Sequence, residues 1–215
     1  MIDPLDRKLL RDLGRMKGQV LAVSLVMASG LCMMIMTRSL ILTLESARAA
    51  YYQQYALADV FAGLKRAPLA VAERIASVPG VAAVETRVVV EVTLDLPGLA
   101  APATGHIISL PEDGAPQKLN RVFLRSGRFP RPDDRREVVL GESFAVANGL
   151  QPGDSLVAVI NGRRETLQIC GIGLSPEFVF EARAGETLPD HKRFSVIWMN
   201  YRALAVAYNL DGAFN

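Results

Sequence analysis

Hydrophobic and polar positions divide this chain of 215 residues into two parts with different patterns. Residues 18–37 form an apolar run of twenty residues without a charged side chain, and no later segment has a comparable run. At about 1.5 Å per helical residue the run spans about 30 Å, which matches the hydrocarbon core of a bilayer. We therefore predict a transmembrane helix over residues 18–44 and a helical stalk over residues 45–58.

The residues before this run predict its orientation. Residues 1–17 have apolar side chains at helical spacing, which is typical of an amphipathic helix lying on a membrane surface or contacting a partner protein. The same leader carries five basic residues that determine topology: Arg7, Lys8, Arg11, Arg15 and Lys17. Because basic residues are sparser after the run, the positive-inside rule places the N-terminus in the cytoplasm.

A cleaved signal peptide is the main alternative to a permanent anchor. The sequence Ala47-Arg48-Ala49 resembles a small-x-small cleavage site. Signal peptides, however, have apolar regions of about 7–15 residues, shorter than the run seen here. The length therefore favours a membrane anchor.

The pattern changes after residue 58 to short strands, helices and turns. The predicted elements of the first half are a strand over 59–64, a helix over 69–76, and a strand over 81–96 that pairs with 106–110. Those of the second half are a strand over 137–140, a helix over 142–148 closed by Gly149, a hairpin of 155–160 with 165–170, a strand over 194–199 and a helix over 201–208. Asn161-Gly162 is the hairpin turn signal. Residues 59–215 are thus predicted to be one α+β extracytoplasmic domain with β-hairpins.

Composition and motifs give no support for an enzyme. The net charge of +2 and the lack of an aromatic-interleaved basic patch argue against nucleic-acid binding. Cys32 lies in the membrane run and Cys170 lies far outside it, so we predict no disulfide between them. His106 and His191 have no partner at metal or triad spacing, and phosphate-loop and zinc patterns are absent. We therefore predict no catalytic, cofactor-binding or metal-binding residues.

Two charged clusters have ordinary structural explanations. Residues 133–137 contain five consecutive charges after two prolines, and we interpret them as a solvated loop. Residues 177–181 place two glutamates beside aromatic residues, and we interpret them as a half-buried edge strand.

Several segments in order resemble one family. Residues 124–130 (LRSGRFP) resemble the Gly-Arg-aromatic-Pro segment of the MacB-like periplasmic core domain. Residues 137–141 (EVVLG) and 150–155 (LQPGDS) are similar to the two runs that follow it. Residues 78–81 (VPGV) and 168–172 (QICGI) match its junctions with strands. Such domains follow the first membrane helix of FtsX-like permeases, the membrane subunits of a class of ABC transporters.

The resemblance implies a function and partners. It implies a permease subunit in a bacterial plasma membrane, with its main domain periplasmic or extracytoplasmic, that couples a separate cytoplasmic ATPase to movement of that domain. A second permease copy or half would be a further partner, and a periplasmic protein another candidate. Family permeases have more membrane helices after this domain, so we expect the sequence to represent the N-terminal part of such a subunit, with the domain incomplete at its C-terminus.

The membrane helix has a feature that suits a multi-helix permease. Ala28, Ser29 and Gly30 are small enough to let a second helix approach closely. The alternative function is a single-pass, membrane-tethered binding or scaffold module that acts by itself. An anchored enzyme is the third hypothesis, and it has no catalytic residues to support it.

Overall fold

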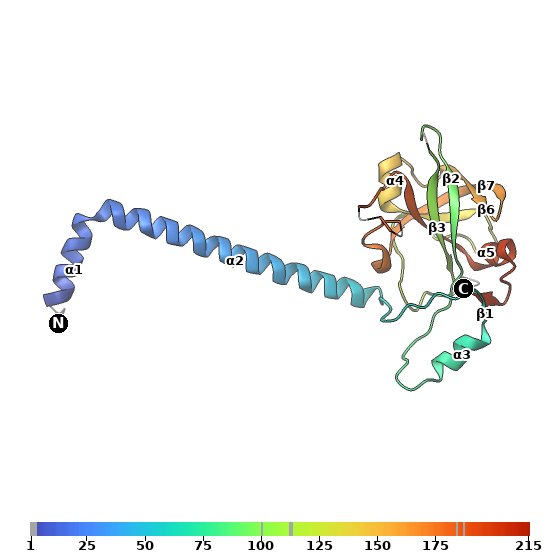
Figure 1. The fold of residues 1–215 in the computed structure, drawn as a ribbon, viewed down its shortest axis with the longest axis horizontal. Coiled ribbons are helices and arrows are strands. Elements are labelled where there is room, and N and C mark those ends of the chain that lie inside the picture. The colour runs from blue at the N-terminus through green and yellow to red at the C-terminus, as the bar shows by residue number, and fades with distance from the viewer. Residues whose placement is uncertain (1–3, 100, 112–113, 184, 187) are drawn as a thin grey trace. The chain divides into compact units, whose positions relative to one another are not determined.

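A computed structural model describes residues 4–99, 101–111, 114–183, 185–186 and 188–215. The chain divides into two compact units, Met1–Tyr51 and Tyr52–Asn215. The first unit is helical and the second is built mainly of strands (Figure 1).

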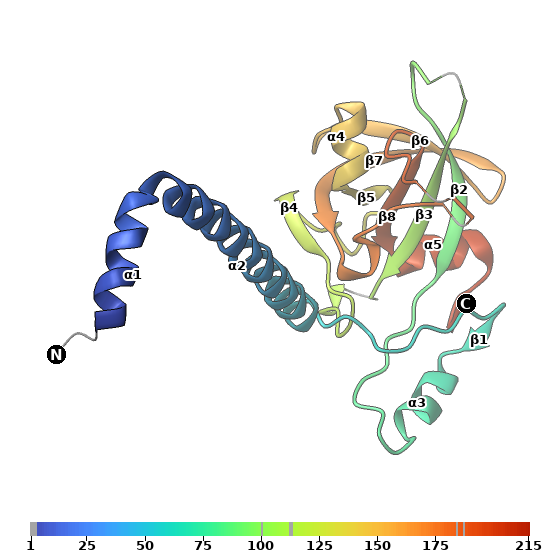
Figure 2. The ribbon, with the colours of Figure 1, turned by 60° about the vertical axis from the view of Figure 1, so that its left-hand side comes forward.

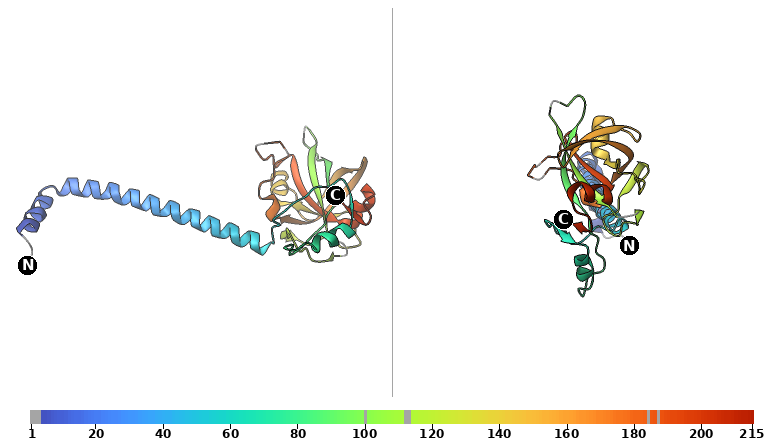
Figure 3. Two further views of the ribbon diagram at one scale, coloured as in Figure 1. Left: turned by 60° about the horizontal axis from the view of Figure 1, so that its bottom comes forward. Right: turned by 90° about the vertical axis from the view of Figure 1, so that its right-hand side faces the viewer.

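The first unit consists of α1 (Pro4–Arg15) and most of α2 (Lys17–Gln54), with a turn at Met16 between them (Figure 3). The 38 residues of α2 correspond to a length of about 57 Å, and none of them is buried. Hydroxyl groups within it bond back to the helix backbone: Ser29 Oγ donates to the Val26 carbonyl at 2.8 Å and Thr37 Oγ1 to that of Met33 at 2.9 Å. This pattern leaves those hydroxyls satisfied without water, as an apolar surrounding requires.

Among the described residues, one helix is long and apolar enough to cross a membrane, and it is α2. It ends at Gln54, so the stalk predicted to reach residue 58 is four residues too long. The cause is a left-handed residue, Ala56 (φ 50°), which turns the chain so that the Leu57 N–H donates to the Tyr52 carbonyl at 2.9 Å. This bond closes the helix end.

The second unit contains a closed ring of six strands. The strands of its sheet are β2 (Val89–Asp95), β3 (Ala103–Leu110), β4 (Phe123–Gly127), β5 (Glu137–Gly141), β6 (Ser155–Ile160), β7 (Arg163–Leu174) and β8 (Phe194–Asn200). Their order is β4-β7-β5-β8-β3-β2-β6, and an additional pairing joins β6 to β7. The ring closes because the first half of the long strand β7 pairs with β6 and its second half pairs with β5 (Figure 2).

Two helices cover the ends of this barrel. α4 (Glu142–Asn148) directly follows β5, and α5 (Tyr201–Tyr208) directly follows β8. Since β5 and β8 are antiparallel, the two helices lie at opposite ends, as Figure 1 shows. Phe144 of α4 and Leu204 of α5 are fully buried and join the inward-facing residues of the strands in one core.

A second apolar cluster lies on the outer face of β3, β5 and β8. It contains Val139, Val196, Trp198 and Ile108, which alternate along their strands with residues of the inner core. β4, an extra strand paired only with β7, and the short 3-10 helix η2 (Pro176–Phe178) contribute Leu124 and Phe178 to this cluster. Strands β5 and β8 are therefore buried on both faces.

A small separate sheet joins the beginning and the end of the second unit. β1 (Ala67–Pro68) pairs antiparallel with β9 (Ala213–Phe214), and α3 (Ala70–Ala76) follows β1. The side chain of Asn215 adds two hydrogen bonds to the backbone of Val89, with distances of 2.7 and 2.8 Å.

Most predicted elements of the second unit are confirmed. The strand over 137–140, the strand over 194–199, the helix over 201–208 and the pairing of 106–110 with the preceding strand are present. The helix 142–148 ends at Gly149 in the left-handed conformation (φ 68°) as expected. The hairpin also forms, with Asn161 (φ 45°) and Gly162 (φ 76°) as its turn. The α+β fold class is confirmed.

Three predictions on strands are wrong, and one strand was missed. Residues 59–64 form no strand, and neither do residues 81–88, so β2 begins only at Val89. No ladder of strand hydrogen bonds forms along either segment, although the Val88 carbonyl accepts the Ser109 N–H of β3 at 2.8 Å. The preference of a residue for strands depends on such pairing and packing. Residues 177–181 begin in the 3-10 helix, whose Ser175 side chain caps the Glu177 N–H, instead of forming an edge strand. Strand β4 was not predicted.

Candidate functional site

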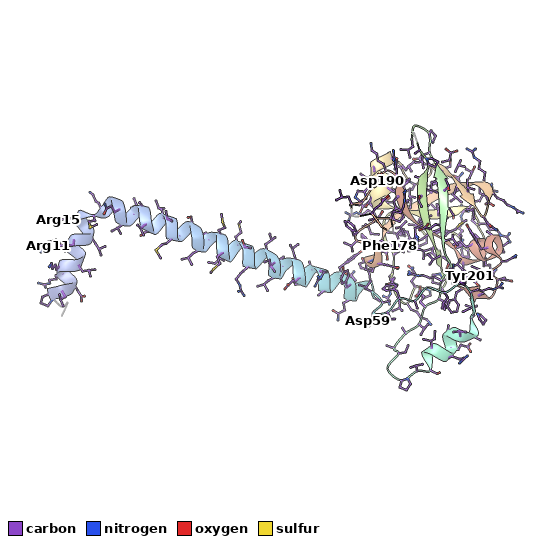
Figure 4. The ribbon with its side chains drawn as sticks, in the orientation of Figure 1. Arg11, Arg15, Asp59, Phe178, Asp190 and Tyr201 are labelled. Atoms are coloured by element: carbon purple, nitrogen blue, oxygen red, sulfur yellow. The ribbon has the colours of Figure 1, made fainter. Side chains whose placement is uncertain are left out.

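The five basic residues predicted to set topology lie on α1 and at the first position of α2. Arg7, Lys8, Arg11, Arg15 and Lys17 are all exposed, and Figure 4 labels Arg11 and Arg15 on α1. In a helix that lies on a membrane surface, the charged side chains must reach water or lipid headgroups, and exposed residues can do so. The orientation of the chain across a membrane stays a prediction.

The three small residues predicted to pack against another helix lie in the first half of α2. Ala28, Ser29 and Gly30 are exposed, and a Cβ added at Gly30 would meet nothing within 4 Å. The first unit therefore leaves this surface accessible to another helix. Packing at these residues stays a prediction.

The candidate functional site is a junction within the second unit, formed by residues 52–58 and a loop that we call the docking loop, residues 117–122. Three hydrogen bonds join the two segments. The Asn120 N–H donates to the Ala56 carbonyl at 2.8 Å, and the Arg121 N–H donates to the Tyr55 carbonyl at 2.8 Å. The Ala58 N–H donates to Asn120 Oδ1 at 2.9 Å. The residues that follow the helix are thus fastened to the barrel instead of forming a free linker.

Asn120 has two roles at the junction. Its backbone is left-handed (φ 47°), a conformation that asparagine tolerates better than most residues. Its side-chain oxygen is then an acceptor for the Ala58 N–H. The Tyr55 and Phe123 rings pack beside these bonds with centroids 5.7 Å apart.

The docking loop is itself held by side chains from two places. One carboxylate oxygen of Glu85 accepts the N–H groups of Lys118 at 2.6 Å and Leu119 at 2.8 Å. Gln117 Oε1 accepts the Val122 N–H at 2.9 Å. Hydrogen bonds to a charged acceptor are stronger than neutral ones, so Glu85 fixes the loop that receives residues 52–58.

A second group of contacts follows the junction along the chain. Asp59, labelled in Figure 4, leads to Phe61, whose ring lies 5.6 Å below the Arg87 guanidinium. Arg87 forms a two-point ion pair with Glu177, with both distances 2.5 Å. Phe178, the next residue, packs against His106 at 5.8 Å. Burial lowers the pKa of His106 and so favours its neutral ring.

An ion pair joins two of the motifs that carry the family resemblance. Arg128 of the Gly-Arg-Phe-Pro segment pairs with Glu137 at the start of β5, one of the two contacts being 2.7 Å. Glu137 is 5% exposed and also accepts the Arg131 N–H at 2.9 Å. Hydrogen bonding from Arg128 lowers the pKa of Glu137 to about 2. The prediction that residues 133–137 are only a solvated loop is therefore wrong for Glu137.

The glycine of the same motif is required by its backbone. Gly127 has φ 79°, and a Cβ there would lie 2.3 Å from the Cys170 carbonyl oxygen. Any residue with a side chain at position 127 would collide with the β7 backbone, so this close contact of β4 with β7 requires glycine. Cys170 lies in a strand, as predicted, and is half-buried. Burial raises its pKa to about 11, which disfavours the nucleophilic thiolate at pH 7.

One carboxyl group of the second unit is buried and has an oxygen without a hydrogen-bond partner. Glu181 is 3% exposed, and its Oε2 has no hydrogen-bond partner. Burial raises its pKa to about 7, against the opposing effect of a hydrogen bond with Ser143. Within the described part of the chain, no group of three or more His, Cys, Asp or Glu side chains is placed to hold a metal ion. The hydrogen bonds and ring contact of the junction hold residues 52–58 in position.

Sequence reasoning missed the junction residues Asn120 and Glu85. The signal for Asn120 was weak, a single asparagine between Leu119 and Arg121 in an otherwise unpatterned stretch. Glu85 had no signal, because its partners are backbone N–H groups more than thirty residues away.

No protein-family model matches the chain, and no curated protein matches it. Solved structures do match. The extracellular domain of the noncanonic ABC-type transporter YknZ from Gram-positive bacteria is 16% identical over 72% of this chain and 74% of that chain, with a TM-score of 0.43. The periplasmic region of MacB from Actinobacillus actinomycetemcomitans is 15% identical over 66% of this chain and 57% of that chain, with a TM-score of 0.37.

Proposed function

We propose that the chain is the N-terminal part of the membrane subunit of an ABC transporter, of the FtsX-like kind. In this function, a partner ATPase in the cytoplasm moves the membrane helix, and the helix moves the extracytoplasmic barrel, for export or for transmission of force. The N-terminus is cytoplasmic and the barrel lies on the outer side, in line with the basic leader. A second permease copy or half packs at Ala28, Ser29 and Gly30.

One observation carries this proposal: the helix is continuous and its end is fastened. α2 has no break from Lys17 to Gln54, and the residues after it bond to the docking loop at Asn120 and Arg121. An unbroken helix transmits displacement, whereas a flexible linker of similar length absorbs it. A module that is only tethered to the membrane needs neither feature. The order of sequence motifs in residues 78–172 supports the same family.

The test is purification of the tagged native gene product from its own membranes, with mass spectrometry of the intact chain and its partners. We expect an ATPase to co-purify. Recovery of the chain without an ATPase would contradict the proposal and favour the alternative, a membrane-tethered binding or scaffold module.

A second measurement tests the junction in the purified complex. Asn120→Ala removes the acceptor of the Ala58 N–H and disfavours the left-handed backbone, so the ATP-dependent movement of the barrel should decrease. Spin labels on the barrel and on residue 46 of α2 would report it as a distance change. Asn161→Ala is the matched control, because Asn161 also has a positive φ (45°) and bonds through its side chain, but to Ala207. If Asn120→Ala and Asn161→Ala reduced the ATP-dependent distance change equally, the junction would have no specific role in transmitting movement.

A further inference from the structure

A cavity of about 470 Å³ lies at the end of the barrel that α5 covers. Its walls are α5, the β6–β7 hairpin and the segment before β5. Tyr201, labelled in Figure 4, marks the first residue of this helix. The volume is within the range of small-molecule sites, about 300–1,000 Å³. No residue of the junction lines this cavity.

The floor of the cavity is apolar. It is made by Ala203, Val206 and Ala207 of α5, and Val206 is 57% exposed. Ile160, Met199 and Leu204 lie beneath it and belong to the barrel core. A ligand on this floor would therefore cover apolar surface that is accessible in the unbound chain.

The rim of the cavity is charged, and the charges do not cancel. Arg135, Arg163 and Glu165 line it. Arg163 and Glu165 occupy the same face of β7 as the core residue Leu167, so the inner face of the strand continues outward as charged residues. Neither arginine forms an ion pair within the part of the chain that the structure describes, whereas the next residue, Arg164, pairs with Asp95. Two guanidinium groups thus face the cavity with a single carboxylate.

Hydrogen bonds hold both sides of the rim in place. At the hairpin turn, the Asn161 N–H donates to Tyr208 Oη at 3.1 Å and Asn161 Nδ2 donates to the Ala207 carbonyl at 2.8 Å. On the other side, Asn200 Nδ2 donates to the carbonyls of Arg131 at 2.6 Å and Asp134 at 2.8 Å, next to Arg135. The backbone that carries each arginine is therefore fixed before any ligand binds.

We propose that this cavity binds a small amphiphilic oxyanion, a carboxylate or phosphate monoester joined to a short apolar chain. The planar guanidinium groups of Arg135 and Arg163 pair with the oxyanion, since arginine matches carboxylate and phosphate geometry with two parallel hydrogen bonds. The apolar chain covers Ala203, Val206 and Ala207. Glu165 repels a second negative charge, which limits the ligand to one anionic group. This binding is independent of the transporter function proposed above.

The test is calorimetric titration of the full-length protein in nanodiscs of neutral phosphatidylcholine. The probes are hexanoate and hexyl phosphate, with acetate, inorganic phosphate, hexanamide and hexylamine for comparison. We expect hexanoate and hexyl phosphate to bind, and acetate and inorganic phosphate to bind about tenfold or more weakly because they leave the floor uncovered. Hexanamide and hexylamine should not bind measurably. Equal affinities for inorganic phosphate and hexyl phosphate, or for hexanamide and hexanoate, would overturn the proposal.

Variants on the rim test the residues. Arg163→Ala and Arg135→Ala should each weaken hexanoate binding about tenfold or more, as loss of a charge-assisted contact does. Glu165→Gln should strengthen it a few-fold, a gain that damage to the fold would not produce. Arg164→Ala is the matched control, because its side chain lies on the other face of β7 and should leave affinity unchanged. Equal losses for Arg163→Ala and Arg164→Ala would overturn the assignment.

The same titration in nanodiscs containing phosphatidylglycerol distinguishes two sources of oxyanion. An unchanged hexanoate affinity supports a soluble ligand. If phosphatidylglycerol weakens hexanoate binding to the natural protein but not to Arg163→Ala, lipid headgroups occupy the site. That result would overturn the assignment of a soluble ligand.

Discussion

Leu31 in α2 is 54% exposed and Leu204 in α5 is fully buried, although both are leucines in helices. The two units use apolar residues in opposite ways. The barrel hides them among its own strands and helices, while α2 presents them on all sides and buries none. On our proposal a bilayer surrounds α2, and lipid tails are as apolar as leucine. The comparison shows that an apolar sequence requires an apolar environment. The sequence does not determine whether protein or lipid provides that environment.

The largest expected difference comes from the same kind of truncation in each unit. Phe144→Ala should lower the free energy of unfolding of the barrel by about 3–5 kcal/mol, because it leaves a cavity in a packed core. Leu31→Ala should leave it unchanged, because Leu31 belongs to the other unit. Denaturant unfolding of the full-length protein in nanodiscs, followed by the fluorescence of the single tryptophan, Trp198, measures both. Similar losses for the two variants would contradict the separation of the units.

An introduced arginine should affect the two units in the opposite order, with the larger effect in α2. Leu31→Arg should disfavour membrane insertion by about 2.5–3.5 kcal/mol, the insertion cost of arginine at a helix centre. The matched variant Val146→Arg lies on α4 at a position 75% exposed to water and should change neither insertion nor barrel stability. The fraction of protein that resists alkaline extraction from membranes measures insertion. Full retention of Leu31→Arg in the membrane would show that α2 does not rely on lipid around Leu31.

Glu181 extends the comparison, because it is an ionisable side chain buried in the second unit. Its pKa is raised from 4.5 to about 7, so the unfolded chain loses this proton at lower pH than the folded one. Barrel stability should therefore fall as pH rises from about 4.5 to 7 and then level off. Glu181→Gln should remove that slope and stabilise the barrel at pH 8 by about 1–3 kcal/mol, with little effect at pH 4. Unfolding midpoints across this pH range measure it, and a slope unchanged in the variant would refute the assignment.

Glu137 shows the opposite case, a buried carboxylate with partners. Its pKa is lowered from 4.5 to about 2, so its stabilising effect is present above pH 4.5 and is lost as pH falls towards 2. Glu137→Gln should cost about 1–2 kcal/mol at pH 7, a modest value because Arg128 is 48% exposed and water screens the pair. The difference from the natural protein should disappear near pH 2. Glu142→Gln, which breaks the exposed pair with Arg125, serves as the control and should have almost no effect.

The sequence predicted those elements whose signal is local. The helix 142–148 ends at Gly149 because glycine adopts the left-handed conformation, and the hairpin turns at Asn161-Gly162 for the same reason. The long helix was predictable from length and composition alone. These features depend on a few neighbouring residues, so one sequence is sufficient to find them.

The sequence did not predict features that depend on distant partners. β4 forms only because β7 continues to Leu174 and offers an edge. Residues 81–88 form no strand, because the ladder between β2 and β3 begins only at Val89. At the candidate site, Asn120 meets Ala56 and Ala58 across more than sixty residues, and Glu137 is buried only when Arg128 folds over it. Charge patterns along the chain do not show which charges a tertiary structure will pair.

The pairing of β1 with β9 has a consequence for how this architecture can change. Residues 67–68 and 213–214 are antiparallel neighbours, and neighbouring strands are about 4.8 Å apart. Everything between them, from Leu69 to Gly212, is therefore a cassette whose two ends meet at one point. Another domain whose termini are a strand's width apart could be exchanged for it if the new domain also bonded residues 52–58, as the docking loop does here. A protein built this way can diversify its outer part by replacing a single block.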